Sequence, residues 1–438
     1  MEPGVPAISE KRWNLDHWQG LIKFMSTKPL SEYSLLDPAV QADPFEFYAK
    51  LHKECPVYRM PETGMYVVTR FEDLAHVLRT PKDFSSDIRS EVGLQDDANL
   101  HQEIIKAQGW VHTPTLQRTD PPVHTRYRKL LNKVFTGKRM KDLAPSIDAL
   151  CNQLIDNFID RGRCEFIDEF ALAFPGTIIA EQIGLDPGDL HRFKRWADAM
   201  LAPATRILSP EETREAAEIE VEAQHYLAKV FEQRRAEPKD DIISGLVHAH
   251  ADGEPPLTMN ELQSLMHQLI TGGYETTTSA LAHGMWMIIR YPEQADKVRQ
   301  DPGLLNNFVE ESLRFESPVQ GLARQTTRDV ELAGTVIPKG SMVLVRYGAA
   351  NRDEAKFPDA GTFDVTREKA VTHMAFGMGV HSCVGALLAR QELRSAYGAL
   401  LSRMDDIELE IPLPDPVTQP SLFFIPIKEM HLKFRKRD

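Results

Sequence analysis

The residues with the strongest chemical signal lie in one short, glycine-bearing segment toward the C-terminal end of the sequence. It reads Phe376-Gly-Met-Gly-Val-His-Ser-Cys383-Val-Gly385 and leads directly into a predicted helix. Glycine lets a backbone pack close to a flat ligand and adopt conformations that other residues avoid. The dipole and free amide groups at the start of the following helix favour a thiolate over a thiol at Cys383. The segment therefore predicts a thiolate that points away from bulk water.

A single shielded thiolate is a suitable axial ligand for haem iron, because it donates electron density that favours O–O cleavage. Two other interpretations of Cys383 were weighed: a buried structural thiol, and a zinc site shared with His381. The fixed offsets of Phe376, Gly377, Gly379 and Gly385 argue against the first. No second Cys/His pair lies at ligand spacing, which argues against the second.

A second group of residues, Thr271-Gly-Gly-Tyr-Glu275-Thr276-Thr277, falls in the middle of a predicted helix. Two glycines and the three consecutive threonines 276–278 are costly inside a helix. A threonine hydroxyl can bond to the carbonyl four residues earlier and bend or open the helix. Such an opening would leave room for O₂ and water beside an acid and an alcohol. By itself, the motif is equally compatible with a small-residue helix crossing in which a distant arginine pairs with Glu275.

Two further sets of residues predict ionic contacts. Glu311 and Arg314 share one helix face at i, i+3 spacing and can form a charge-assisted bond. Such pairs are common on solvated faces, so this one alone indicates only an ion pair. The other set consists of cations that could hold buried carboxylates, which need such partners: His124, Arg128, Arg324 and His381.

The cysteine segment resembles the cysteine-ligand loop of the cytochrome P-450 (haem-thiolate) family, with its Phe, two glycines, a basic residue, Cys and Gly. The resemblance extends over most of the chain, from the strand pattern near Val57 to the tip at Phe423. It implies haem b with Cys383 as the axial ligand and Phe376, Gly377 and Gly385 in the loop around it. It also implies an acid–alcohol pair, in which Thr276 donates a hydrogen bond to bound O₂ and Glu275 connects it to solvent protons.

The same resemblance assigns further roles by matching position. Arg367 is implied as the structural partner of Glu311 and Arg314, and the four cations as the ligands of the haem propionates. The segment 84–119 is implied as a substrate-access loop. The positions that match the family's substrate pocket are Gly272, Val319, Gln320, Leu322, Leu422 and Phe423. These are largely apolar, with Gln320 as the one polar contact, so we expect a neutral hydrophobic substrate: a terpenoid, steroid, fatty acid or aromatic hydrocarbon.

The activity implied is a monooxygenase that inserts one atom of O₂ into such a substrate. No flavin or iron–sulfur domain is fused to the sequence, so we expect a separate ferredoxin or flavodoxin, with its reductase, as electron donor. An acidic donor would dock on basic residues near Cys383, drawn from Arg126, Arg128, Lys129, Lys133, Lys138 and Arg139. A peroxide-driven peroxygenase and a non-enzymatic haem-binding protein remain the alternatives.

Composition supports this interpretation in general terms. The sequence has 438 residues with 51 basic and 64 acidic side chains, a net charge of −13, and is 42% hydrophobic. This composition excludes disordered and collagenous classes and argues against nucleic acid as a partner. The four cysteines are far apart and are expected to be reduced thiols. With no secretory signal or credible membrane span, we expect a cytoplasmic monomer without membrane insertion.

The elements that must position these residues are mostly helices. We expect one mainly α domain over 1–438, with residues 1–40 as an N-terminal extension and small β regions at 56–69, 330–345 and 407–434. Asp120 is expected to cap a helix that starts at Pro121. The capping box Thr258-Met-Asn-Glu261 predicts a long central helix over 259–289. Shorter helices are expected at 71–79 and 386–403, and an irregular loop at 84–119.

Overall fold

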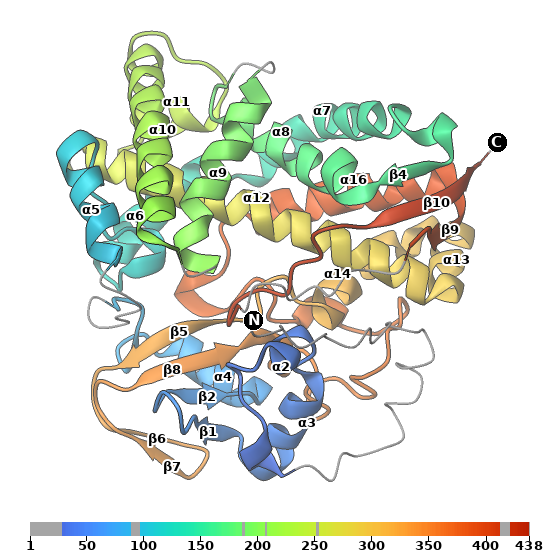
Figure 1. Cartoon of the computed structure of the whole chain (residues 1–438), viewed down its shortest axis with the longest axis horizontal. Helices are drawn as coiled ribbons and strands as arrows, with labels where there is room; N and C mark the ends of the chain where they lie inside the picture. The colour runs from blue at the N-terminus through green and yellow to red at the C-terminus, as the bar shows by residue number, and fades with distance from the viewer. Residues whose placement is uncertain are drawn as a thin grey trace, which may run out of the picture.

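A long helix, α12 (Met259–Arg290), crosses the molecule between a larger helical part and a smaller lobe that contains most of the strands (Figure 1). The computed structural model describes residues 29–88, 97–185, 189–205, 208–250, 254–411 and 421–437. Most of the expected N-terminal extension, residues 1–28, therefore lies outside the described residues. Its last part instead packs into the fold, since Tyr33, Leu35 and Val40 are buried against the smaller lobe.

The helical part surrounds α12 on several sides and holds the largest cluster of buried apolar side chains. Its helices are α6 (Val123–Val134), α7 (Gly137–Asp156), α8 (Ala173–Gln182), α9 (Leu190–Thr205), α10 (Pro210–Ala236), α11 (Ile242–Val247), α13 (Pro292–Gln300), α14 (Leu305–Phe315) and α16 (Ala386–Arg403). A small antiparallel sheet of β4 (Arg163–Glu165), β10 (His431–Lys436) and β9 (Met404–Leu409) closes one end.

The smaller lobe is a five-stranded sheet flanked by short helices. Its strand order is β1 (Val57–Arg59), β2 (Tyr66–Val68), β8 (Met342–Arg346), β5 (Gly321–Thr326) and β3 (Phe84–Ser85). Only β2 and β8 pair in parallel. The lobe also contains the hairpin of β6 (Val330–Leu332) and β7 (Thr335–Ile337), with helices α2 (Pro38–Ala42), α3 (Phe45–Glu54), α4 (Phe71–Arg79) and α15 (Tyr347–Ala350).

The long central helix forms because its sequence specifies both of its ends. Thr258 accepts a hydrogen bond from the Glu261 backbone, and the Glu261 carboxylate accepts one from Thr258, which completes the expected capping box. The helix ends at Arg290, where Tyr291 leaves the helical conformation and Pro292 begins α13. Apolar residues are buried on all sides of α12, as expected for a helix inside a large domain.

Two expectations are wrong: the irregular loop at 84–119 and the capping role of Asp120. Residues 97–108 form a helix, α5 (Asp97–Gln108), rather than an irregular loop; residues 89–96 lie outside the described residues. Its apolar residues Ile104 and Ile105 pack on α10, a tertiary contact that no local pattern announces. Asp120 does not cap α6; its carboxylate instead accepts hydrogen bonds from Ser85 and Ser86.

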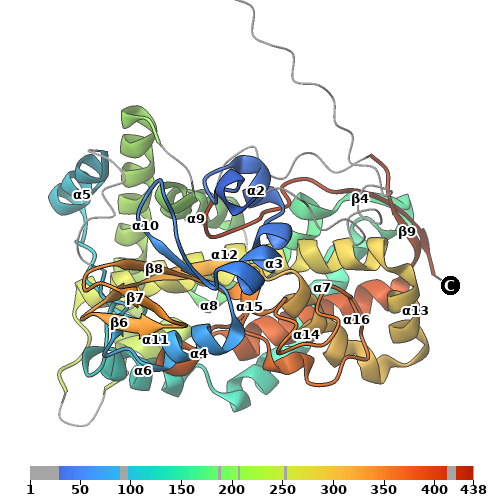
Figure 2. The same cartoon turned by 90° about the horizontal axis from the view of Figure 1, so that it is seen from below.

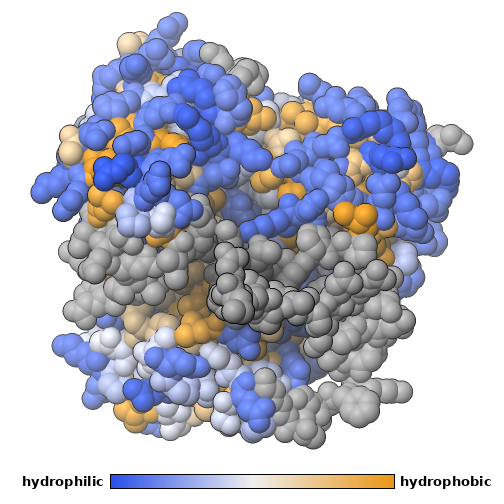
Figure 3. All heavy atoms as spheres, viewed as in Figure 1, coloured by the Kyte–Doolittle hydropathy of each residue, from blue (hydrophilic) through white to orange (hydrophobic). Residues whose placement is uncertain are grey.

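The helix that follows Cys383 connects the cysteine segment to the centre of the fold. α16 begins at Ala386 and lies beside α14 in Figure 2. The Tyr397 hydroxyl of α16 donates to the Ala280 carbonyl of α12 at 2.7 Å. No helix among the described residues is long and apolar enough to cross a bilayer. Hydrophilic residues predominate over α10 and its neighbours on the face drawn in Figure 3.

Candidate functional site

The sulfur of Cys383 lies inside the fold at a point where several groups favour negative charge. Cys383 has exposed surface, yet burial raises the pKa of its thiol. Together these facts describe a side chain that faces an internal space. The backbone amides of Gly385 and Ala386, with Arg128 and Arg390 nearby, act against burial and lower the pKa. The groups that act on the pKa of this sulfur are thus hydrogen-bond donors and cations.

The cysteine segment has its shape because of two glycines with positive φ. Gly377 has φ +66° and Gly379 has φ +73°, a region that other residues rarely adopt. A Cβ on Gly379 would lie 2.4 Å from the Leu78 carbonyl oxygen, so only glycine allows the segment to meet the end of α4. The Cys383 amide then donates to the Phe376 carbonyl at 2.8 Å and closes the loop. A Cβ on Gly385 would lie 3.9 Å from the Cys383 sulfur.

Glu310 and Glu311, two consecutive residues of α14, form ion pairs with arginines on either side of this segment. Glu311 forms a bidentate bond with Arg314, at 2.7 Å to both Nε and Nη2, and neither side chain has any exposed surface. Arg367 Nε donates to the same carboxylate at 3.0 Å, so the structure brings the three expected residues together. Arg314 also donates to three backbone carbonyls, those of Asn351, Ala360 and Thr362.

The neighbouring Glu310 was not singled out in the sequence, although it pairs with Arg390, which stacks on Phe376 of the cysteine segment. It accepts two hydrogen bonds from Arg390, at 2.6 and 2.8 Å, and lies 3.1 Å from His373 Nε2. These partners overcome the effect of burial and lower the pKa of Glu310 to about 2. Arg390 in turn stacks on the ring of Phe376, 4.4 Å from its centroid. Arg390 thus links Phe376, at the start of the cysteine segment, to Glu310 of α14.

The four expected cations converge from three elements, with His124 and Arg128 both on α6, on one place beside Cys383. The rings of His124 and His381 are 4.3 Å apart, and Arg128 donates to the Ser382 carbonyl. Burial, then the charges of Arg324, His124 and Arg128, lower the pKa of His381 to about 3. His124 Nε2 is buried without a hydrogen-bond partner. Two arginines, two imidazoles with lowered pKa values and one buried nitrogen with no partner in the described part of the chain thus lie together, an arrangement that an anion would stabilise.

Two more residues belong to this cation group that the sequence did not reveal. Arg118, just before α6, is close enough to Arg324 that burial and that charge both lower its pKa. The buried Tyr347 hydroxyl is hydrogen-bonded to Arg324, and burial raises its pKa. Each comes from a segment with no motif of its own, so only the folded arrangement places them here.

On α12, the expected acid and alcohol are adjacent, but the helix is not opened. Thr276 Oγ1 donates to the Gly272 carbonyl at 2.6 Å, and α12 continues without a break through this point, which corrects the expected opening. Gly272 is exposed, and a Cβ there would meet no atom within 4 Å. Burial, then the charge of Asp198, raise the pKa of Glu275, and Lys428 acts in the opposite direction. Glu275 thus faces an acid and a cation, not an arginine.

A further carboxyl, Glu392 of α16, lies on the same side of the fold and was missed in the sequence. Burial raises its pKa to about 8, with a Thr277 hydrogen bond acting against the shift. Its Oε1 has no hydrogen-bond partner, and the residue is only 1% exposed. A neutral carboxylic acid is therefore buried directly behind the threonines of α12. Glutamate in an apolar helix is the only sequence signal, and it is too common to single one out.

The expected substrate positions are not all placed for a ligand. Val319 and Leu322 are half-buried beside the sheet, and Val319 pairs with Phe424. Phe423 is half-buried; Leu422 packs instead against the cluster that includes α3. Gln320 stays a predicted substrate contact, because its side-chain oxygen has no hydrogen-bond partner among the described residues. It is 1% exposed, its amide donates to the Ser317 carbonyl at 2.8 Å, and Gly348 has no Cβ that would collide with its oxygen.

Comparison with known proteins identifies the class that this fold and site define. The cytochrome P450 family model matches residues 33–434, and the chain belongs to that family. It is a haem-thiolate monooxygenase with haem b as cofactor and O₂ as co-substrate, and it takes a small-molecule substrate and electrons from a redox partner.

Individual relatives cover nearly the whole chain. Cytochrome P450 CYP107DY1 of Priestia megaterium is 35% identical, over 85% of this chain and 92% of the relative. The structure of cytochrome P450 CYP109Q5 from Chondromyces apiculatus matches with a TM-score of 0.81 and 32% identity, over 93% of this chain and all of that one. CYP109E1 from Bacillus megaterium, solved in complex with corticosterone, matches with a TM-score of 0.79 and 29% identity, over 90% and 99%.

Proposed function

We propose that this P450 hydroxylates a bulky, neutral, hydrophobic molecule of the size of a steroid, with Cys383 as the axial ligand. The observation that carries the assignment is the sulfur itself, which faces an internal space and receives the Gly385 and Ala386 amides. Haem, when bound, supplies the oxidising chemistry: one atom of O₂ enters a C–H bond and the other leaves as water, at the cost of two electrons and two protons. The protein contributes ligand geometry, protons and exclusion of water.

The cations beside Cys383 fit the two propionate carboxylates of haem. His124, Arg128, Arg324 and His381 are assigned to this role, and Arg118 and Tyr347 are added to it. Each propionate would replace part of the hydration that these groups lose on burial, and it would accept the hydrogen bond that His124 Nε2 lacks.

Protons reach the α12 site through Glu275 and Thr276. Burial and the charge of Asp198 raise the pKa of Glu275, so this acid keeps its proton to a higher pH than an exposed glutamate does. Asp198 is itself influenced by Lys194 and Asp168, and Lys194 Nζ donates to Asp168 at 3.2 Å at the exposed surface. This series of acids gives a path from solvent to Glu275, from which Thr276 passes the proton on.

The substrate class is inferred from the pocket residues and one relative. Val319, Leu322 and Phe423 are apolar, and Gln320, whose side-chain oxygen has no hydrogen-bond partner in the part of the chain that the structure describes, is the one polar side chain among the assigned positions. Apolar pockets of this kind select by shape and hydrophobicity. A relative that covers almost the same length was solved with corticosterone, which favours a steroid over a fatty acid or a small aromatic compound.

Electrons are assigned to a separate ferredoxin or flavodoxin, with its reductase, that docks over the Cys383 side of a cytoplasmic monomer. Three exposed apolar residues surround that side: Val123 of α6, Val380 and Leu387. Lys129 of α6 is exposed beside them, whereas Arg126 and Arg139 of the expected basic cluster are already paired with Glu261 and Asp240. A small apolar patch with a cationic rim is suited to a transient acidic partner.

The proposed function is tested by product analysis under ¹⁸O₂. The haem-loaded enzyme is supplied with a ferredoxin, its reductase and NADPH, and is given a steroid, a fatty acid and a terpenoid in turn. We expect steroid product with one labelled oxygen and about one NADPH consumed per product. Label derived from water, or equal turnover by hydrogen peroxide without the donor, would instead identify a peroxygenase. Haem incorporation without any product would favour a binding protein.

A further inference from the structure

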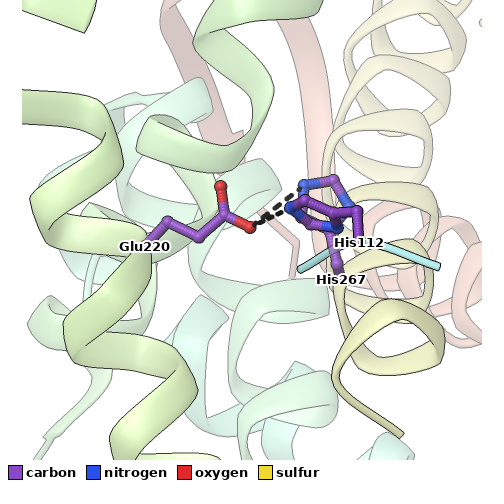
Figure 4. A group of neighbouring side chains, drawn as sticks. All are labelled: His112, Glu220 and His267. Atoms are coloured by element: carbon purple, nitrogen blue, oxygen red, sulfur yellow. Dashed lines mark ion pairs between the residues drawn. The ribbon is translucent and has the colours of Figure 1, made fainter. Parts of the chain in front are cut away.

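Three histidines and one glutamate meet where α5 and the segment after it approach α10 and α12. We refer to His101, His112, Glu220 and His267 as the histidine–glutamate cluster. His112 Nε2 lies 2.7 Å from Glu220 Oε1, and His267 Nε2 lies 3.9 Å from the same oxygen. His101 Nε2 lies 3.2 Å from Glu220 Oε2. Figure 4 shows the two nearest imidazoles pointing at the carboxylate.

The carboxylate of this cluster is buried and incompletely satisfied. Glu220 is 1% exposed. Glu220 Oε1 and His101 Nε2 are both buried and have no hydrogen bond of acceptable geometry, despite the short distances between them and their neighbours. The His112 and His267 rings meet edge to face, with centroids 4.8 Å apart. The Nε2 atoms of both rings approach Glu220 Oε1. Buried polar atoms without partners are costly, so a missing partner is expected here.

We propose that the histidine–glutamate cluster binds a divalent transition metal, with Zn²⁺ as the fitting ion. The ligand atoms of His112, Glu220 and His267 all lie within 4.8 Å of one another. Tetrahedral zinc with bonds of about 2.0–2.1 Å holds its ligand atoms about 3.4 Å apart. His112 Nε2, 2.7 Å from Glu220 Oε1, would move slightly away from that oxygen, and His267 Nε2, at 3.9 Å, would move slightly closer. Imidazole and carboxylate are ligands that zinc accepts, and His101 Nε2 lies 3.2 Å from the other carboxylate oxygen.

The position of the cluster gives the ion a structural consequence. His101 lies on α5 and His112 in the segment after it, whereas Glu220 lies on α10 and His267 on α12. An ion here would fasten α5 and its following segment to two long helices at once. The same segment is already aligned by Trp110 and Gln224, whose backbone and side-chain amide groups exchange hydrogen bonds of 2.7 and 3.1 Å. Gly109 permits this contact, because a Cβ there would lie 2.2 Å from Gln224 Oε1.

The site is separate from the haem chemistry in its residues. None of its four members belongs to the cysteine segment or to the cation group, and His267 lies about two and a half helical turns before Thr276 on α12. The proposal therefore does not depend on the substrate or on the proton path. It predicts a second metal in the purified protein besides iron, bound by a part of the chain that the resemblance assigned to substrate access.

The test is zinc binding to the haem-loaded full chain after treatment with a chelator. Titration calorimetry with ZnCl₂ is run on the wild type, on Glu220→Gln and on His112→Gln. We expect one Zn²⁺ per chain in the wild type, and at least a 100-fold weaker affinity in both variants. The matched control is His225→Ala: His225 lies on the same helix as Glu220, and its ring contacts the Gln108 carbonyl at 2.8 Å. This variant should bind zinc like the wild type.

Two outcomes would overturn the proposal. Either the wild type takes up no stoichiometric zinc, or Glu220→Gln and His112→Gln bind it as tightly as the wild type does. If a variant fails to fold, as judged by haem content and circular dichroism, X-ray absorption at the zinc edge of the wild type decides. Two or three imidazoles with oxygen at about 2.0–2.1 Å support the site; sulfur in the coordination sphere places the zinc elsewhere and contradicts it.

Discussion

The carboxyl groups on the two sides of the molecule's centre are in opposite electrostatic states. On α14, Glu310 and Glu311 each have arginine partners, and the pKa of Glu310 is lowered to about 2. Beside α12, Glu275 is half-buried and Glu392 is buried; neither has an ion pair among the described contacts, and burial raises the pKa of both, that of Glu392 to about 8. The first pair has arginine partners that offset burial; the second has none among the residues that the structure describes.

This difference separates two tasks. A carboxylate that accepts several hydrogen bonds holds its neighbours in one arrangement, which suits the helix behind the Cys383 segment. A carboxyl whose pKa is close to the working pH can take up and release protons, which suits the helix that would face O₂. Buried ion pairs need not add net stability, but the removal of one partner leaves a buried charge and is very costly. The predictions below test this contrast.

The largest effect is expected from Glu311→Gln. The substitution leaves Arg314 uncompensated, with no exposed surface, and should lower the free energy of unfolding by about 3–5 kcal/mol. Urea unfolding of the haem-loaded protein measures it, together with the fraction of protein that retains haem. Arg163→Ala is the control, because Arg163 pairs with Glu410 at 68% and 37% exposure, and should change stability by less than about 1 kcal/mol. Equal effects of both variants would refute the rigid role of α14.

Thr276→Ala should have the next largest effect, on catalysis and not on stability. Loss of the alcohol removes the final proton donor, so product formation should fall about 100-fold while NADPH consumption continues. Product, hydrogen peroxide and NADPH are measured in the same reaction. Thr278→Ala is the matched control, since its buried hydroxyl also bonds to the carbonyl four residues earlier, that of Tyr274. Full coupling of NADPH to product in Thr276→Ala would exclude the role assigned to Thr276.

Glu392→Gln should change how stability depends on pH. A carboxyl with a pKa of about 8 in the folded state keeps a proton that the unfolded chain releases above its ordinary value of 4.5. The free energy of unfolding of the wild type therefore falls as the pH rises from 4.5 to 8, by about 1.4 kcal/mol per pH unit from this group. Glu392→Gln should lose that slope.

Urea midpoints of the wild type and of Glu392→Gln at pH 5, 6, 7 and 8 measure this difference. Glu310→Gln gives the opposite sign: the stability contributed by Glu310 is present above pH 4.5 and is lost as the pH falls toward 2. Parallel profiles for the wild type and Glu392→Gln would mean that Glu392 is charged at neutral pH, and the contrast between the two regions would then fail.

The smallest effect is expected at the surface over the Cys383 segment. Lys129→Glu should slow reduction by ferredoxin a few-fold at low salt, and the difference should shrink as salt is added, since surface charges are screened. Stopped-flow reduction at several salt concentrations measures it. Lys53→Glu, an exposed lysine on α3 in the other lobe, is the control. An identical salt dependence for the two variants would move the docking surface away from α6.

The sequence was informative where the chemistry is local. The fixed offsets around Cys383, the capping box of α12 and the Glu311–Arg314 spacing each lie within a few residues, so their contacts follow from the helix and turn geometry that the sequence specifies. Helix α16, expected over 386–403, has these limits in the structure.

What the sequence did not reveal depends on contacts between distant residues. Glu310 meets Arg390, and Glu220 meets His101 and His112, across long stretches of chain. Asp120 was expected to cap the nearest helix, yet it bonds to Ser85 and Ser86 because the fold brings β3 beside it. The Gln320 amide donates to the Ser317 carbonyl, a contact that the sequence did not indicate. Such partners are chosen by tertiary packing, which no local pattern records.

The central claim is that Cys383 is the thiolate ligand of the haem, and the ferrous–CO spectrum tests it most directly. The dithionite-reduced protein is examined with and without carbon monoxide, as wild type, as Cys383→Ser and as Cys164→Ser, a buried cysteine of β4. We expect the strongly red-shifted Soret band of thiolate ligation in the wild type and in Cys164→Ser, and its loss in Cys383→Ser. A red-shifted band that survives in Cys383→Ser would contradict the account.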